Sequence, residues 1–190
     1  MTATETYATL AQVRNDLNID ADTDDRAAAV EPALNAAHDA VDRHCHRTFG
    51  KLDTAEAREF VVPYASELLT VPDMAEAPTQ VVMRVEFSHP WDDEGLTWTT
   101  RPTPPGQPYA ALIRIGGPWP AALFPTVAVT AKWGWPSVPA SVTQATRLLA
   151  VRYISRFKKP LLADGPDGQL LRVDPDVRWL LRPFVRAWDA

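Results

Sequence analysis

The sequence has only one cysteine, Cys45, in 190 residues. A single cysteine excludes an intrachain disulfide and fits a reducing compartment. No apolar run approaches membrane-spanning length, and the first ten residues lack the basic and apolar regions of a signal peptide. We therefore expect a globular protein that acts where it is made, in a cytoplasm, and has no membrane partner.

Catalytic signatures are missing as well. No serine lies in a Gly-x-Ser-x-Gly elbow, and Cys45 is predicted to lie within a helix, beside histidines that cannot face it. Gly116 and Gly117 are followed by Pro118, which removes a backbone donor that phosphate-binding loops need. The sequence thus argues against an enzyme and predicts no catalytic residue and no cofactor.

One group of metal-ligating residue types does occur, at His38, Asp42 and His46. A spacing of four places these three side chains on one face of a helix, whereas adjacent residues point apart. A metal site would need a further ligand, which the sequence does not supply nearby. A metal-dependent enzyme using His38, Asp42 and His46 is therefore the less favoured alternative to an exposed polar face.

The N-terminal part predicts two helices, at about residues 9–18 and 25–49. Thr9 and Gln12 form a capping-box pattern at the start of the first helix. The second can be capped by Asp24 or Asp25 and closes before Gly50. Its apolar stripe consists of Val30, Leu34, Ala37, Val41 and Cys45.

Pro32 interrupts this second helix. Either the helix starts late, with Pro32 in its first turn, or it kinks at that residue.

The periodicity changes over about residues 57–133, where short β-branched or aromatic runs are separated by Pro, Gly and Asp clusters. These runs predict a small, largely antiparallel β-region inserted between helices. The overall prediction is an α+β fold that is mainly helical. The predicted strands cover residues 60–62, 68–71, 81–87, 96–99, 109–115 and 127–132.

A Trp133-Gly134-Trp135-Pro136 corner follows the last strand. Neither Pro136 nor Pro139 can donate a ladder hydrogen bond, so the strand stops there and a helix begins just after Pro139. This helix covers about residues 140–159, with Ser141 as its cap. We interpret the corner as a rigid joint between the β-region and the helix.

The helix over residues 140–159 carries apolar residues on more than one side. One stripe consists of Val142, Ala145, Leu149, Tyr153 and Phe157, and Leu148, Val151 and Ile154 lie outside it. Such a helix is either central to a monomer core or packs against a second partner. The second interpretation makes Leu148, Val151 and Ile154 a subunit interface.

The last predicted helix covers about residues 175–188, with Asp174 as cap and Pro175 at its first position. Pro183 should bend or end it. A short amphipathic helix of this kind is typical of a docking element. Its apolar face consists of Val177, Leu180, Leu181, Phe184 and Trp188, and its basic stripe of Arg178, Arg182 and Arg186.

The net charge of −5 is unevenly distributed. Acidic residues crowd the N-terminal part, whereas basic residues dominate the helix before Pro160. This polarity indicates either oriented association, acidic end toward basic end, or an ordinary solvated surface. The basic helices leave a DNA-binding regulator as an alternative, although the chain is acidic overall and carries no DNA-binding motif.

Three stretches carry a resemblance to a known family. They are YATLAQVRNDLNI (7–19) leading to AHDAVDRHCHRTFG (37–50), TAKWGWPSVPASVTQATRLLAVRYISR (130–156) and DPDVRWLLRPFVR (174–186). By the content and order of these stretches, the chain resembles the head-tail adaptor proteins of tailed double-stranded DNA bacteriophages. These proteins are also called head-completion or head-tail connector proteins. The resemblance covers the helical half of the chain.

The resemblance implies one adaptor domain over residues 1–190 and a structural role in a virion, at the head-tail interface, after assembly in the host cytoplasm. Members of the family form a ring, typically of twelve copies, beneath the portal. The ring extends the DNA channel and joins the next neck or tail-completion protein. The implied partners are therefore the portal protein, that neck or tail protein, other copies of the chain, and packaged DNA that passes without sequence-specific binding.

On this interpretation the last helix docks to the portal or an adjacent subunit. Leu148, Val151 and Ile154 contact a neighbour in the ring. The acidic residues near the second helix rim the channel, where charge repulsion lets DNA slide. These rim residues are Asp20, Asp22, Asp24 and Asp25.

Overall fold

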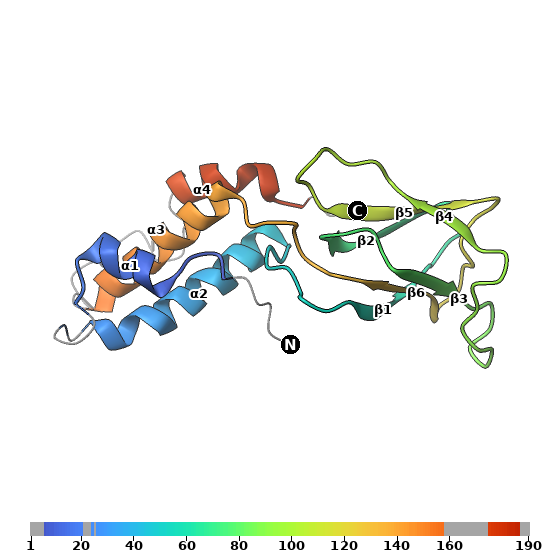
Figure 1. Cartoon of the computed structure of the whole chain (residues 1–190), viewed down its shortest axis with the longest axis horizontal. Coiled ribbons are helices and arrows are strands. Elements are labelled where there is room, and N and C mark those ends of the chain that lie inside the picture. Colours follow the sequence, from blue (N-terminus) through green and yellow to red (C-terminus); the bar gives the residue numbers. More distant parts are fainter. Residues whose placement is uncertain (1–5, 21–23, 25, 158–174, 187–190) are drawn as a thin grey trace, which may run out of the picture. The chain divides into compact units, whose positions relative to one another are not determined.

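The structure is a computed structural model that describes residues 6–20, 24, 26–157 and 175–186. Internal contacts divide the chain into a β unit, Thr48–Ser137, and a helical unit, Thr6–Arg47 with Val138–Ala190. The chain thus enters the β unit from the helical unit and returns to it (Figure 1). The predicted α+β class is confirmed, and one adaptor domain over residues 1–190 stays a prediction.

The first helix, α1, spans Leu10–Leu17 and begins as the sequence predicts. The Gln12 N–H donates to the Thr9 hydroxyl at 3.2 Å, and the Thr9 N–H donates to the Gln12 side chain at 2.8 Å. This reciprocal pair is the predicted capping box. Asn18 ends the helix in the left-handed conformation, with φ of 49°.

Helix α2 spans Ala27–Cys45 and differs from its prediction at both ends. It begins before Pro32, so the late start is wrong and Pro32 lies inside the helix. Its N-cap is Arg26, without a side-chain cap bond, because the Asp24 carboxylate accepts the Arg26 N–H at 2.8 Å instead of one from within the helix. His46, with φ of 52°, ends the helix in place of Gly50.

Helix α3, Ala140–Phe157, begins directly after Pro139, as predicted. The N–H groups of Val142 and Thr143 donate to the Pro139 carbonyl, so Ser141 lies in the first turn and is not the cap.

Helix α4, Pro175–Leu181, is continued by the 3₁₀ helix η2, Arg182–Phe184. Pro183 therefore ends the α-helix, as predicted, whereas Asp174, Trp188 and the Phe157 side chain lie outside the described residues.

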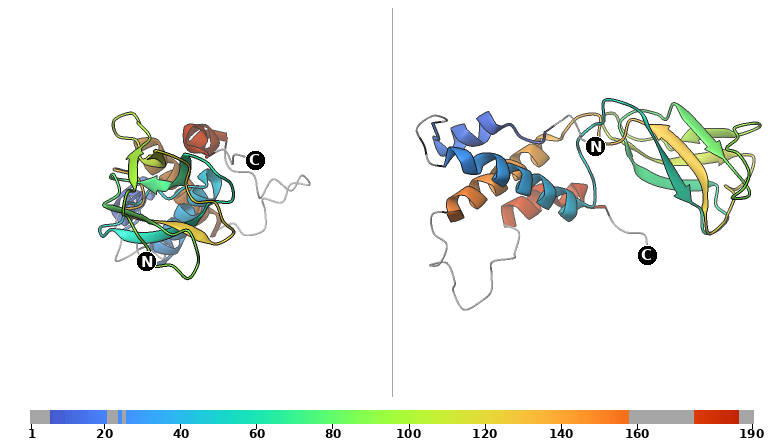
Figure 2. Two further views of the ribbon diagram at one scale, coloured as in Figure 1. Left: turned by 90° about the vertical axis from the view of Figure 1, so that its right-hand side faces the viewer. Right: turned by 90° about the horizontal axis from the view of Figure 1, so that it is seen from below.

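In the helical unit α2 packs along α3, α4 packs on α3, and α1 contacts both α2 and α3 (Figures 1 and 2). The whole predicted stripe of α2 is buried. From α3, Val142, Ala145, Leu149 and Ile154 are buried as well. The Arg147 guanidinium forms a salt bridge with the Asp16 carboxylate, with Nε to Oδ2 at 2.9 Å, and thereby connects α3 to α1.

Among the described residues no helix is long and apolar enough to cross a bilayer.

The β unit contains two three-stranded antiparallel sheets. One has the order β1-β6-β3, formed by Glu56–Val61, Pro125–Ala131 and Gln80–Met83. The other has the order β2-β5-β4, formed by Leu68–Met74, Tyr109–Ile115 and Thr97–Thr100. All six predicted strands are present, but β3 ends at Met83, where the prediction continued to Phe87.

The two sheets share one hydrophobic core. Val71 from β2 and Leu112 from β5 pack with Val129 from β6, and Trp119 and Trp133 from the connecting segments close the cluster. A bridge between Met74 and Trp133 also links the two sheets at one corner. The β-branched and aromatic runs that predicted the strands thus supply the two inner faces that pack on each other.

The Trp133-Gly134-Trp135 corner is held inside the β unit by hydrogen bonds. The Trp133 indole donates to the Glu56 carbonyl at 2.8 Å, and the Trp135 indole donates to the buried Asp73 carboxylate at 2.9 Å. The Gly134 N–H donates to the Asp73 carbonyl at 2.8 Å. These three hydrogen bonds hold the corner in place within the β unit.

Gly134 is required by its surroundings. Its φ of 107° is one that side-chain-bearing residues rarely adopt, and a Cβ there would lie 2.1 Å from the Gly50 carbonyl oxygen. No rotamer change relieves such a contact, because the backbone fixes the position of a Cβ and the Gly50 oxygen is itself a backbone atom.

We predict that Gly134→Ala destabilises the β unit by at least about 2 kcal/mol, through backbone strain and the clash with Gly50. Gly106→Ala is the matched control, since Gly106 also has a positive φ, of 79°, but no atom lies within 4 Å of a Cβ there. The control should cost only about 1–2 kcal/mol. Urea unfolding followed by circular dichroism measures both, and equal costs would show that the Gly50 contact is unimportant.

Candidate docking surface

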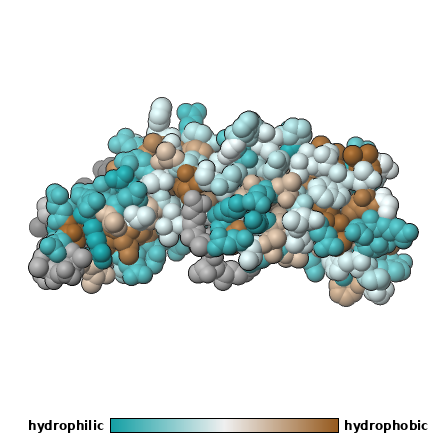
Figure 3. Space-filling model, in the orientation of Figure 1, coloured by the Kyte–Doolittle hydropathy of each residue, from teal (hydrophilic) through white to brown (hydrophobic). Residues whose placement is uncertain are grey.

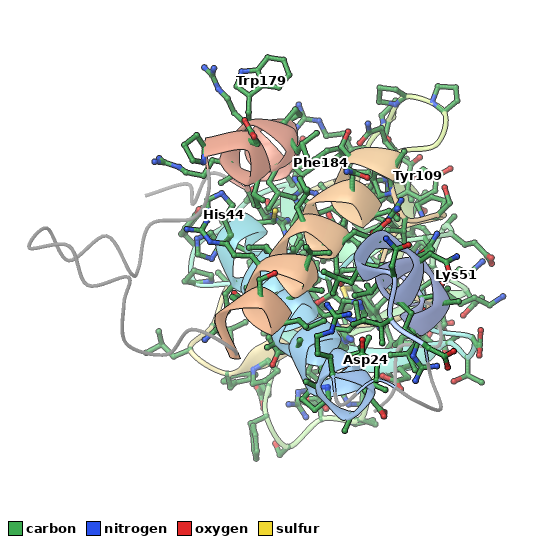
Figure 4. The ribbon with its side chains drawn as sticks, turned by 90° about the vertical axis from the view of Figure 1, so that its left-hand side faces the viewer. Asp24, His44, Lys51, Tyr109, Trp179 and Phe184 are labelled. Atoms are coloured by element: carbon green, nitrogen blue, oxygen red, sulfur yellow. The ribbon has the colours of Figure 1, made fainter. Side chains whose placement is uncertain are left out.

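A groove lies beside α4 in the helical unit. Its volume is about 520 Å³, and it is lined by His44, Pro175, Arg178, Trp179, Arg182 and Val185. We call these six residues the α4 surface. Trp179 is 76% exposed and projects away from α4, with His44 on the neighbouring end of α2 (Figure 4). An exposed tryptophan flanked by two arginines is a composition enriched at protein interfaces.

The positive charge of this surface comes from its arginines. Arg178 and Arg182 lie four residues apart on one helix face and are both exposed. Burial lowers the pKa of His44, and the positive charges of Arg178 and His46 lower this pKa further. His44 is therefore an uncharged lining residue at neutral pH, and none of the described residues that line the groove is acidic.

The structure buries part of the predicted apolar docking face of the last helix, and docking by this helix stays a prediction. Val177 and Leu181 are buried within the helical unit, at 1% and 0% exposure, so they hold α4 on its own chain. Leu180 and Phe184 are half-buried. Arg186 is half-buried too, and its N–H donates to the Cys45 carbonyl at 3.0 Å. The apolar stripe thus serves mainly to attach α4 to its own unit.

Trp179 and Val185, which sequence reasoning missed, are exposed instead. Trp179 follows Arg178 and lies off the apolar stripe of the helix. A tryptophan at such a position is expected to be exposed, and this pattern could have identified Trp179 from the sequence.

The predicted subunit interface on α3 is exposed only in part. Leu148 is 38% exposed and Val151 is half-buried. Ile154 is buried at 1% exposure, because it extends the inner row of Thr146 and Ala150 at a spacing of four. Of the three residues, Ile154 is thus the one that the structure buries, and the subunit interface stays a prediction.

The predicted channel rim contains two described residues. Asp20 is exposed. Asp24 is half-buried and its carboxylate pairs with the Arg26 guanidinium, with Nε to Oδ1 at 2.9 Å. Asp22 and Asp25 lie outside the described residues. The rim assignment of Asp20 and Asp24 stays a prediction.

The His38, Asp42 and His46 triplet does not converge. The Asp42 carboxylate accepts a hydrogen bond from the Tyr7 hydroxyl at 2.6 Å, and the His38 ring lies against the Tyr7 ring at 4.8 Å. His46 is in the left-handed position that ends α2, so it leaves the helical face on which the spacing argument depended. Within the described part of the chain no three His, Cys, Asp or Glu side chains are placed to hold a metal ion.

Cys45 lies in the core of the helical unit. Burial raises the pKa of its thiol from 9.0 to about 12, and the nearby Asp42 carboxylate adds to this increase. Because the folded pKa lies above the unfolded one, the thiol contributes stability that is fully present below pH 9 and lost as the pH rises toward 12. A thiol of this kind is a packing residue and not a nucleophile.

We predict that Cys45 of the folded protein reacts with iodoacetamide at pH 8 at least about 100-fold more slowly than in urea, since the thiolate is the reactive form. Mass spectrometry of the alkylated protein over time measures both rates. The unfolded chain is the internal control, and equal rates in both states would contradict the burial of this thiol.

Among known proteins, the chain is similar to solved structures. No family model matches the chain, and no curated protein matches it. The fold is similar to that of a chain in the neck of an empty gene transfer agent (GTA) particle, determined with sixfold symmetry, with a TM-score of 0.63 and 20% identity. It is also similar to chains in the neck of the native particle, determined with twelvefold symmetry, with a TM-score of 0.58 and 19% identity, and in the virion of the native particle, at 0.60 and 19%. Each match covers 100% of this chain and 96% of the matched chain, so the similarity extends over the whole fold.

Proposed function

We propose that the chain is a structural subunit of the neck of a phage-like particle, a head-tail adaptor that assembles as a ring beneath the portal. The observation that carries the proposal is the full-length fold similarity to a neck chain, which includes both the helical unit and the β unit. A similarity confined to one unit would fit many unrelated proteins, because small sheets and helix bundles recur.

The symmetry of the related particles supports the ring. The neck of the empty particle was determined with sixfold symmetry and that of the native particle with twelvefold symmetry. In a closed ring each subunit uses two different faces, one toward each neighbour. Leu148 and Val151 on α3 are our candidates for one such face.

The other partners follow from the adaptor role. The portal protein lies above the ring and a further neck or tail-completion protein lies below it. Packaged double-stranded DNA passes through the channel without sequence-specific contacts. Asp20, Asp22, Asp24 and Asp25 are proposed to rim this channel, where like charge keeps DNA from adhering. No catalytic step is part of the proposal.

Deletion of the gene in its phage or phage-like element tests the proposal. We expect DNA-filled heads that lack tails, counted by electron microscopy, and recovery of complete particles when the wild-type gene is supplied in trans. Complete particles formed in the absence of the protein would overturn the adaptor role.

We predict that Leu148→Glu leaves the isolated protein folded but lowers its incorporation into necks at least 10-fold, since a charge buried in an interface without a partner costs about 2 kcal/mol or more. Gln144→Glu adds the same charge one turn earlier on the exposed side of α3 and is the matched control. Normal incorporation of Leu148→Glu would exclude this interface, and loss of the fold would place Leu148 in the core.

A further inference from the structure

The connection between β3 and β4, residues 84–96, is an exposed acidic segment of the β unit, and we call it the acidic loop. It carries four exposed carboxylates, Glu86, Asp92, Asp93 and Glu94. Its basic residues pair with carboxylates of the β unit. The Arg84 side chain is 12% exposed and its guanidinium pairs with Glu59 of β1 at 3.8 Å, and the His89 ring pairs with Glu86 at 3.3 Å.

The acidic loop also exposes apolar side chains. Val85 is 65% exposed and Phe87 is 68% exposed. The Phe87 ring meets the Phe124 ring edge to face at 5.9 Å, and the next residue toward the N-terminus, Leu123, is 93% exposed. Hydrophobic patches bordered by hydrophilic ones are visible over the β unit in Figure 3. Apolar groups gathered on an exposed loop and rimmed by charges mark an interaction site.

Backbone and side-chain contacts give the acidic loop a defined shape. Met83 and Asp92 exchange two backbone hydrogen bonds, at 2.7 and 2.9 Å, which close the base of its first part. The Arg84 guanidinium lies over the rings of Trp91 and Phe87, at 4.2 and 4.9 Å, and donates to the Pro125 carbonyl at 2.8 Å. Because the loop is ordered before binding, little conformational entropy is lost when it docks.

The α4 surface has the complementary chemistry. Arg178 and Arg182 offer two exposed positive charges, and Trp179 between them offers an exposed aromatic face. The acidic loop offers carboxylates on either side of exposed Phe87. Arginine with carboxylate and aromatic with aromatic are the pairs that contribute most at interface centres.

We propose that the acidic loop of one copy binds the α4 surface of a neighbouring copy. The occupant is a second copy because this chain itself carries an exposed segment of the matching charge and apolar content. The contact is heterologous, joining two different faces, and repetition of such a contact generates a ring when the rotation closes. This inference rests on the proposed ring and specifies which faces meet in it.

Charge reversal tests the contact on the purified full-length protein. The α4 variant is Arg178→Glu with Arg182→Glu. The loop variant is Glu86→Lys with Asp93→Lys and Glu94→Lys. Asp92 is retained because its side chain accepts the Glu94 N–H at 2.9 Å. Glu31→Lys with Asp39→Lys and Asp53→Lys changes the net charge by the same amount as the loop variant, at exposed sites elsewhere, and is the matched control for that variant.

Sedimentation velocity at low salt, over a range of concentrations, measures self-association. We expect the wild type and the control to associate, and each single-face variant to associate at least about 10-fold more weakly. An equimolar mixture of the two single-face variants should recover association, because an intact loop meets an intact α4 surface and a reversed loop meets a reversed α4 surface. A variant with both faces reversed should regain self-association, and added salt should weaken every one of these contacts.

The proposal is overturned if the wild type stays monomeric, if the single-face variants associate like the wild type, or if their mixture stays monomeric. A loop that bound the α4 surface of its own chain would give the first of these results. Circular dichroism confirms that each variant is folded. None of these measurements needs a particle, so a failed contact is distinguishable from a failed adaptor role, which the gene deletion tests separately.

Discussion

The close approach of two backbone segments at Gly134 and Gly50 is the constraint on which the β unit depends. A Cβ at Gly134 would lie 2.1 Å from the Gly50 carbonyl oxygen, so only glycine allows the segment that follows α2 to pass the segment that precedes α3. Around this crossing, the buried Asp73 carboxylate accepts from the Trp135 indole, and the Phe49 ring packs on Trp135 at 5.2 Å. The two places where the chain enters and leaves the β unit are thereby fixed to each other.

The helical unit is organised by a different principle, the burial of apolar stripes. The stripe of α2 is fully buried, and the apolar residues of α3 and α4 are mostly used within the same unit. Leu148 on α3, and Trp179 with its flanking arginines on α4, are among the residues that stay exposed, and we propose them as contacts to partners. A ring subunit needs such exposed residues on more than one face, because it has a neighbour on either side.

Local sequence patterns predicted the elements well where the cause of the structure is local. The capping box of Thr9 and Gln12 and the start of α3 after Pro139 depend on atoms a few residues apart, and both are present. Predictions failed where distant contacts compete with local preference. Pro32 is tolerated inside α2, and His46 rather than Gly50 ends that helix, while the Gly50 carbonyl lies in the crossing with Gly134.

The charge pattern shows the same division. The sequence places acidic residues near one end and basic residues in α3, and the structure pairs Asp16 with Arg147 and Asp24 with Arg26 inside one copy. Exposed charges of opposite sign are gathered on the α4 surface and on the acidic loop. By itself, the sequence determined the class of fold, the number of strands and their approximate places along the chain, and the buried stripe of α2, because periodicity and capping are local properties. Only the tertiary structure decided which apolar and charged side chains are consumed within the chain and which are left for partners, because that depends on which distant segments pack together.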